Sequence, residues 1–141
     1  MTSLAYQIEQ KATVRTAKQA DGVRTMLRLE GLMLLAIALG LYARMGGGWT
    51  VFAVLFLVPD LSMLFYVFGT RAGAAAYNAA HSTVGPLALC AVSILTAQTF
   101  VLALALIWLA HIGFDRALGY GLKYADGFGH THLGWIGKKR A

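Results

Sequence analysis

The sequence has little charge, little proline and almost no cysteine for its length. Only 13% of its 141 residues are charged, and it has two prolines and one cysteine. Typical soluble domains carry about 25% charged residues, so this composition argues against a soluble enzyme and against a disordered chain. Because Cys90 is alone, no disulfide can form within the chain and no cluster of thiolates can hold a metal.

The sequence is correspondingly rich in apolar residues. They make up 58% of the chain and give it a mean hydropathy of +0.63. They form four segments, at 27–44, 49–68, 72–96 and 98–118. As a helix, each segment of about 20 residues spans a hydrocarbon layer of roughly 30 Å. The sequence therefore predicts an all-α integral membrane protein, with a four-helix bundle over residues 27–118.

Positive charge is spread unevenly over the two sides of this bundle. Residues 1–26 are expected to form a basic arm on lipid headgroups, because no apolar run of the signal-peptide type occurs there. Residues 119–141 form a tail rich in glycine, aromatic and basic residues. Four spans put both termini on one side, and that side carries all the Lys and Arg residues except Arg44. The positive-inside rule predicts a multi-pass protein of the inner membrane with both termini in the cytoplasm.

Six polar side chains lie within the predicted spans, where such groups are costly and suggest function. They are Glu30 in the first segment, Asp60 in the second, Asn78 and His81 in the third, and His111 and Asp115 in the fourth. With alternating topology, all six fall in the cytoplasmic half of the bilayer. A random distribution would place them in both halves.

Four of these residues have the chemistry and spacing of metal ligands. His111 and Asp115 are four residues apart and share one face of their helix. Pro59 is expected to kink the second helix just before Asp60 and to open space there. Two imidazoles and two carboxylates suit a divalent cation, with zinc first and manganese or iron as alternatives. The sequence therefore predicts a metal site made of Asp60, His81, His111 and Asp115.

Several stretches resemble known families. LRLEGL (27–32), PDLSML (59–64), YNAAH (77–81) and LAHIGFDRALGYGLKY (109–124) look like the small bacterial membrane proteins of the domain of unknown function 4260 family. A more distant similarity is to inner-membrane predicted metal-dependent hydrolases, related in pattern to zinc-dependent phospholipase C. Those proteins carry Leu-Pro-Asp, Thr-His-Ser and His-x-x-x-Asp on successive helices. The similarity implies that the same four residues bind the metal, although Ser62 stands where those hydrolases have a second Asp.

The leading hypothesis is a membrane-embedded metal-dependent hydrolase. The depth of the site and the distant resemblance point to an amphipathic substrate from the inner leaflet, such as a phospholipid or an isoprenoid phosphate. Glu30 is expected to act as general acid or base, and Asn78 to orient water or substrate. Membrane lipids are the expected partners, with Tyr77 and Trp108 in the interfacial aromatic belt. A homo-oligomer is an open alternative, and nothing predicts nucleic-acid recognition.

Non-enzymatic alternatives remain open. The polar cluster could fix helix packing in an accessory or structural subunit, or carry protons or metal ions. A carrier needs polar residues along its whole path, and the outer half of this chain has few, mainly at 96–99. His130 and His132 are either solvated tail residues or part of a lid over the cytoplasmic mouth. In such a lid they would meet an anionic substrate together with Lys123.

Overall fold

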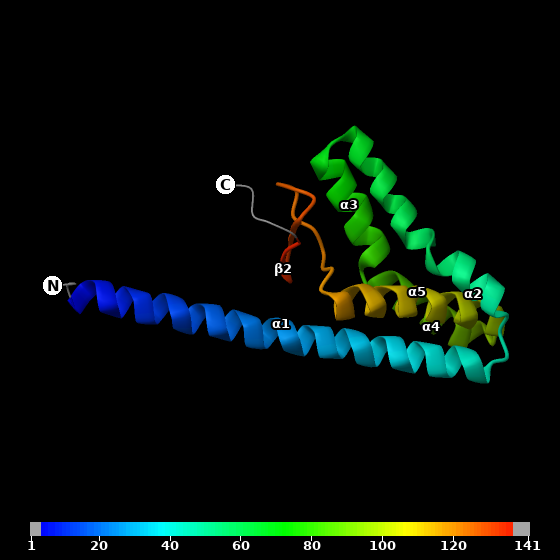
Figure 1. Cartoon of the computed structure of the whole chain (residues 1–141). Helices are drawn as coiled ribbons and strands as arrows, with labels where there is room; N and C mark the ends of the chain where they lie inside the picture. Colours follow the sequence, from blue (N-terminus) through cyan, green and yellow to red (C-terminus); the bar gives the residue numbers. More distant parts are fainter. Residues whose placement is uncertain (1–3, 137–141) are drawn as a thin grey trace.

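The computed structural model describes residues 4–136, without the side chains at 5 and 16–18, so the KKR run at 138–140 lies outside the described residues. Its elements (Figure 1) are α1 (Leu4–Arg44), α2 (Trp49–Phe56), the 3₁₀-helix η1 (Val58–Phe68), α3 (Thr70–His81), α4 (Val84–Thr96), α5 (Thr99–Leu118) and the short antiparallel strands β1 (His130–Thr131) and β2 (Gly134–Trp135). Four helical stretches are long and apolar enough to cross a membrane, namely Tyr6–Arg44, Trp49–Phe68, Thr70–Thr96 and Thr99–Leu118. The predicted helical class and the four apolar helices are confirmed.

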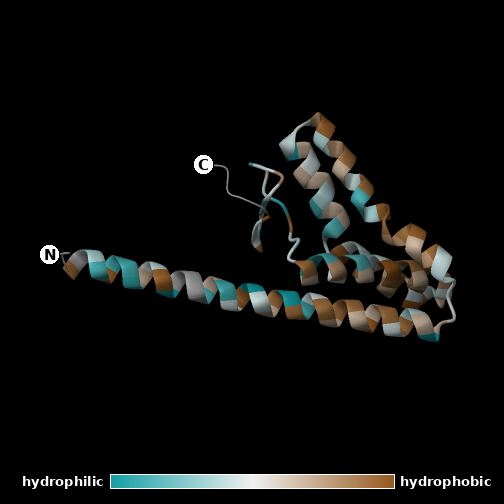
Figure 2. Ribbon diagram, in the orientation of Figure 1, coloured by the Kyte–Doolittle hydropathy of each residue, from teal (hydrophilic) through white to brown (hydrophobic). Residues whose placement is uncertain are grey.

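The first helix is far longer than the predicted first span. α1 is continuous over 41 residues, which at 1.5 Å per residue is about 60 Å, twice the thickness of a hydrocarbon layer. Hydrophilic residues concentrate in its N-terminal half, and apolar ones in its C-terminal half (Figure 2). Leu32, Met33 and Ile37 are exposed there, as lipid-facing side chains would be. The predicted basic arm is thus a helical extension of the first apolar segment.

Helices α1, α4 and α2 pack against α5. The most extensive of these contacts is with α1. Glycines allow α1 and α5 to approach closely, because a Cβ atom on Gly113 would lie 2.6 Å from the backbone nitrogen of Leu35. Close backbone approach of this kind is how helices associate in lipid, where van der Waals packing drives association. α5 is therefore the scaffold on which the polar residues of its C-terminal half are held.

The two middle segments are interrupted. As predicted, regular α-helix ends just before Pro59, and η1 continues the second segment with Asp60 in its first turn. The expectation of one helix over 72–96 is wrong, because the backbone at Ser82 is extended, with φ −80° and ψ 139°. In a continuous helix the ring of Pro86 would clash with the carbonyl of Ser82, four residues earlier. α3 therefore ends at His81, and both interruptions lie next to a predicted metal ligand.

η1 and α3 pack against each other and form a hairpin that leans away from the α1–α5 pair (Figure 1). After α5 the chain turns at Gly119, whose φ of +98° suits a residue without a side chain. The tail then returns beside α1 and α3. It has its own backbone pairing, between β1 and β2 and between Lys123 and Thr131. This path brings the tail to the end of α5 where the polar residues lie.

Candidate metal centre

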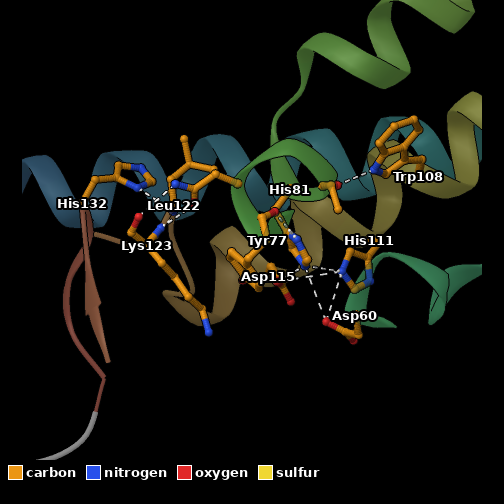
Figure 3. Close-up of polar contacts among 11 residues, drawn as sticks. Asp60, Tyr77, His81, Trp108, His111, Asp115, Leu122, Lys123 and His132 are labelled. Carbon is orange, nitrogen blue, oxygen red and sulfur yellow. Dashed lines mark hydrogen bonds and ion pairs between the residues drawn. The ribbon is translucent and has the colours of Figure 1, made fainter. Parts of the chain in front are cut away.

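Four side chains from three elements point toward one another (Figure 3): Asp60 from η1, His81 from the end of α3, and His111 and Asp115 from α5. One nitrogen or oxygen atom of each lies within 4.8 Å of the others. The Nε2 atoms of the two histidines are 3.1 Å apart. Nε2 of His81 is 3.5 Å from Oδ1 of Asp60 and 3.5 Å from Oδ2 of Asp115. The structure thus brings together all four residues that the sequence singled out.

The spacing of these atoms matches the coordination shell of a metal ion. Nε2 of His111 lies 3.7 Å from Asp60 and 3.9 Å from Asp115. Tetrahedral zinc, with bonds of about 2.0–2.2 Å, places neighbouring ligand atoms roughly 3.3–3.6 Å apart. The five separations that involve an imidazole run from 3.1 to 3.9 Å and bracket this range. The residues present therefore fit a divalent cation.

The hydrogen bond of His81 sets the direction of its lone pair. Its Nδ1 lies 2.9 Å from the backbone carbonyl oxygen of Tyr77. A carbonyl only accepts, so Nδ1 carries the proton and donates it to this bond. The neutral imidazole then presents the Nε2 lone pair to the carboxylates of Asp60 and Asp115. Metal-ligating histidines are oriented in this way, and a cation between the three groups turns a repulsive arrangement into an attractive one.

Aromatic side chains enclose the cluster. The ring of Tyr77 stacks on His81 with ring centroids 3.7 Å apart, and its hydroxyl donates to Oδ2 of Asp115 at 3.1 Å. Phe56 packs edge-on against His111. Tyr77 is only 3% exposed, so its expected place in an interfacial aromatic belt is wrong. Its position four residues before a histidine, on the same helix face, was the available signal for its role.

A pocket of about 380 Å³ opens beside the cluster. Asp60 and Asp115 line one part of it and Lys123 another, and most of the remaining lining is apolar or aromatic, including Phe114 and Leu118. Asp60 is the more exposed of the two carboxylates, with 36% of its side chain exposed against 15% for Asp115. The pocket thus combines charged walls with apolar ones, as an amphipathic ligand requires.

Lys123 is the tail residue that reaches this pocket. Its side chain is 5% exposed, and Nζ lies 3.1 Å from the centre of the Phe128 ring and 4.2 Å from that of Tyr77. Burial lowers the pKa of its ammonium to about 8, although the carboxylates of Asp115 and Asp60 raise it. Of the three tail residues expected to meet a substrate, the lysine is the one that lines the pocket.

Asn78 holds the backbone of Lys123 in place. Its Oδ1 accepts from the Lys123 backbone N–H at 2.7 Å, and its Nδ2 donates to the Lys123 carbonyl at 2.9 Å. The amide therefore pairs with the tail as a neighbouring strand would. Both polar atoms of the Asn78 side chain thus bind the tail. Its expected role in orienting water or substrate stays a prediction.

Three other predicted residues lie outside the cluster. Glu30 is exposed on α1, and no interaction within residues 4–136 joins it to the four clustered side chains. His130 pairs with Asp126 at 2.7 Å. Nδ1 of His132 accepts from the backbone N–H of Leu122 at 2.8 Å. Helix spacing alone placed Glu30 at the right level of the bundle, but it did not determine which way the side chain faces.

Residues 24–136 match the family described as domain of unknown function (DUF4260). The chain belongs to this family. The matched range includes the four apolar segments up to 118, the four clustered residues and Lys123, and it begins within α1. The resemblance to this family, predicted from the sequence motifs, is thereby confirmed, whereas the more distant similarity to metal-dependent hydrolases stays a prediction. No curated protein and no solved structure matches the chain.

Proposed function

We propose that the chain is a metal-dependent hydrolase of the inner membrane, with both termini in the cytoplasm, that cleaves an amphipathic, lipid-phosphate-like substrate from the inner leaflet. The observation that carries the proposal is the convergence of two carboxylates on the lone pair of His81. Two neutral imidazoles and two carboxylates carry two negative charges, which a divalent cation balances. Without it, the carboxylates would face each other in a region where unpaired charge is expensive.

The ligand set favours zinc. Zinc takes imidazole nitrogen and carboxylate oxygen in tetrahedral geometry, whereas manganese favours carboxylate, carbonyl and water oxygens. Catalysis also needs a position for water. Catalytic zinc sites usually have three protein ligands and a water, and some become five-coordinate in the transition state, so with all four side chains bound the water would be a fifth ligand. The pocket beside Asp60 supplies access for that water, because Asp60 is the more exposed of the two carboxylates.

Each residue of the site has a function in this mechanism. A bound divalent cation would lower the pKa of a water molecule and polarise the bond to be cleaved. Asp60 faces His81 and His111 with Oδ1, so Oδ1 would bind the cation and its other oxygen, Oδ2, would accept the proton of the attacking water. The hydroxyl of Tyr77 holds Oδ2 of Asp115, and the Tyr77 carbonyl holds Nδ1 of His81, so these two side chains keep their orientation. This assigns to Asp60 the proton transfer expected of Glu30, whose side chain lies outside the cluster.

The apolar wall of the pocket supports a lipid-like substrate. Phe114 and Leu118 line the pocket and are 40% and 51% exposed, so they continue from its interior to the surface of the helices. They belong to the last turns of α5, the end that the charge distribution predicts to lie at the cytoplasmic face. A substrate held there would keep its apolar part against these side chains and its polar group at the cluster.

Metal content tests the proposal directly. Elemental analysis of detergent-purified protein is expected to show roughly stoichiometric zinc, manganese or iron, which Asp60→Asn and His111→Ala both lose. Asp126→Asn is the matched control, because it removes an exposed carboxylate of the tail and should retain the metal. Folded wild-type protein that binds no metal, even when metal is offered, would contradict the proposal. Metal-loaded protein that hydrolyses no lipid phosphate would favour a carrier or an accessory subunit.

A further inference from the structure

Lys123 carries a largely buried side chain whose ammonium feels the carboxylates of Asp115 and Asp60 but forms no ion pair with them. Its side chain is 5% exposed, yet its ammonium makes no hydrogen bond or ion pair with any residue that the structure describes. Its neighbours are the faces of Phe128, Tyr77 and Tyr66. An ammonium has three donors, and aromatic faces satisfy none of them as an anion does. Because Lys123 also lines the pocket, its ammonium is accessible to a ligand there that carries acceptors.

The backbone around Lys123 is fixed more firmly than an exposed loop requires. Besides the two hydrogen bonds to Asn78, the residues on either side are paired across the tail. The N–H of Tyr124 donates to the carbonyl of His130 at 2.9 Å, and the N–H of His132 donates to the carbonyl of Leu122 at 3.0 Å. The aromatic rings restrict the side chain as well. The ammonium is therefore held in place before any ligand arrives, which lowers the entropic cost of binding.

The same pocket is also lined by two members of the candidate metal cluster. Asp60 and Asp115 line the pocket with Lys123, and neither forms an ion pair with its ammonium. Once a divalent cation balances the two carboxylates, Lys123 is the remaining charge of the pocket, and it is positive. A pocket of about 380 Å³ would then be lined both by the residues that hold the metal and by the ammonium of Lys123. That charge pattern selects an anion with oxygens on more than one side.

We propose that Lys123 is the residue that recognises the substrate, and that it binds a phosphate group with at least two free oxygens, held between its ammonium and the metal. Lysine is a common phosphate ligand and acts as a point charge. This inference rests on the proposed function, because it needs a metal bound by residues that line the same pocket as Lys123. The recognised chemistry is the phosphate group itself, whether it belongs to a lipid headgroup or is free in water.

Binding measurements on metal-loaded protein test this role. The variants are Lys123→Met, which keeps the apolar stem, Lys123→Arg, which keeps the charge, and Lys11→Met, the same substitution at an exposed position of α1. The probes are inorganic phosphate, nanodiscs containing phosphatidic acid, and nanodiscs of phosphatidylcholine alone. Metal content is measured on the same samples. Lys123→Gln serves as a second neutral variant in case Lys123→Met does not fold.

The proposal expects Lys123→Met to retain stoichiometric metal and to lose about tenfold or more in affinity for the phosphate probe. Lys123→Arg should keep most of the affinity, and Lys11→Met should match the wild type. Tighter binding of phosphatidic acid than of the other two probes identifies the lipid as the source, and preference for inorganic phosphate identifies the free anion. Either preference supports the role of Lys123.

Two results would overturn the inference while leaving the metal site intact. One is unchanged phosphate affinity in metal-loaded Lys123→Met, or in Lys123→Gln. The other is a metal-loaded wild type that binds neither inorganic phosphate nor phosphatidic acid. A wild type without metal is a different failure, since it overturns the proposed function and removes the basis of this inference together with it.

Discussion

Replacing Tyr77 by Phe removes one hydroxyl and tests whether the cluster is organised around a cation. The ring can remain stacked on His81, 3.7 Å away between centroids, so the substitution deletes only the 3.1 Å hydrogen bond to Oδ2 of Asp115. Groups that orient a metal ligand typically account for about 10–100-fold in metal affinity. Because this hydrogen bond is long, we expect the lower end, about tenfold, which corresponds to ~1.4 kcal/mol.

Competition with a chelator at fixed pH measures this change. The same loss should appear in thermal unfolding, since a tenfold weaker ligand at a fixed saturating concentration stabilises the folded state by ~1.4 kcal/mol less. Metal-free Tyr77→Phe should differ from metal-free wild type by less than this. The two assays together separate an effect on metal binding from a general loss of stability.

Tyr66 provides the matched control. Its hydroxyl is buried and has no hydrogen-bond partner among the described residues, so Tyr66→Phe removes the same group from a neighbouring ring without deleting a contact to a ligand. We expect its metal affinity to equal that of the wild type. The reasoning is refuted if Tyr77→Phe binds metal as tightly as the wild type, or if both variants weaken binding equally.

Three further predictions follow from the tail and from the packing of α1 on α5. Asn78→Ala should accelerate amide hydrogen exchange at Lys123, which loses its 2.7 Å acceptor, without changing metal content. Phosphate affinity should fall above about pH 8, where the lowered pKa of Lys123 lets the ammonium lose its proton. Because the unfolded chain keeps that proton up to the ordinary pKa of 10.5, the free energy of unfolding should rise with pH between these values. Gly113→Ala should lower the melting temperature through a loss of about 1–3 kcal/mol, since its Cβ would meet the backbone of Leu35 at 2.6 Å.

Each of these predictions has its own control. Asn78→Asp keeps an oxygen that can accept from the Lys123 N–H, so it should retain part of the protection of this amide from exchange. Equal exchange rates in both variants would contradict the role of Asn78 in holding the Lys123 backbone. Lys123→Arg stays protonated at all accessible pH values, and its phosphate affinity should not fall above pH 8. A Cβ atom added at Gly40 would meet nothing within 4 Å, so Gly40→Ala should not lower the melting temperature. Helix propensity alone would raise the melting temperature of both variants, so an equal change at both glycines would contradict close packing at Gly113.

Much of the helical layout could be predicted because it depends on local properties of the chain. Apolar runs of about 20 residues determine where helices able to cross a membrane occur, and Pro59 determines where the second one is interrupted. The pair His111 and Asp115 shares a face because four residues make about one turn. The break at Ser82 could also have been predicted, because it follows from Pro86 four residues later. Hydropathy alone, however, favoured one continuous apolar helix.

The surroundings of the cluster could not be predicted, because they depend on how separate segments are rotated and packed. Helix spacing gives the level of a side chain along the bundle, but it leaves open the direction in which that side chain points. The sequence placed Glu30 and His81 both at the level of the site. In the structure Glu30 is exposed, whereas His81 is buried in the cluster with 4% of its surface exposed. The role of Tyr77 depends on the contact of its hydroxyl with another helix.

By itself the sequence determined four apolar helices, their order, and the four side chains able to bind a metal, since composition and spacing are properties of the chain alone. Only the tertiary structure decided that these four converge and that Lys123 lines the same pocket as Asp60 and Asp115. Lys123 lies eight residues beyond Asp115 and reaches the pocket because the tail folds back onto Asn78. Such contacts between distant segments arise from packing and hydrogen bonding in three dimensions, and no local pattern encodes them.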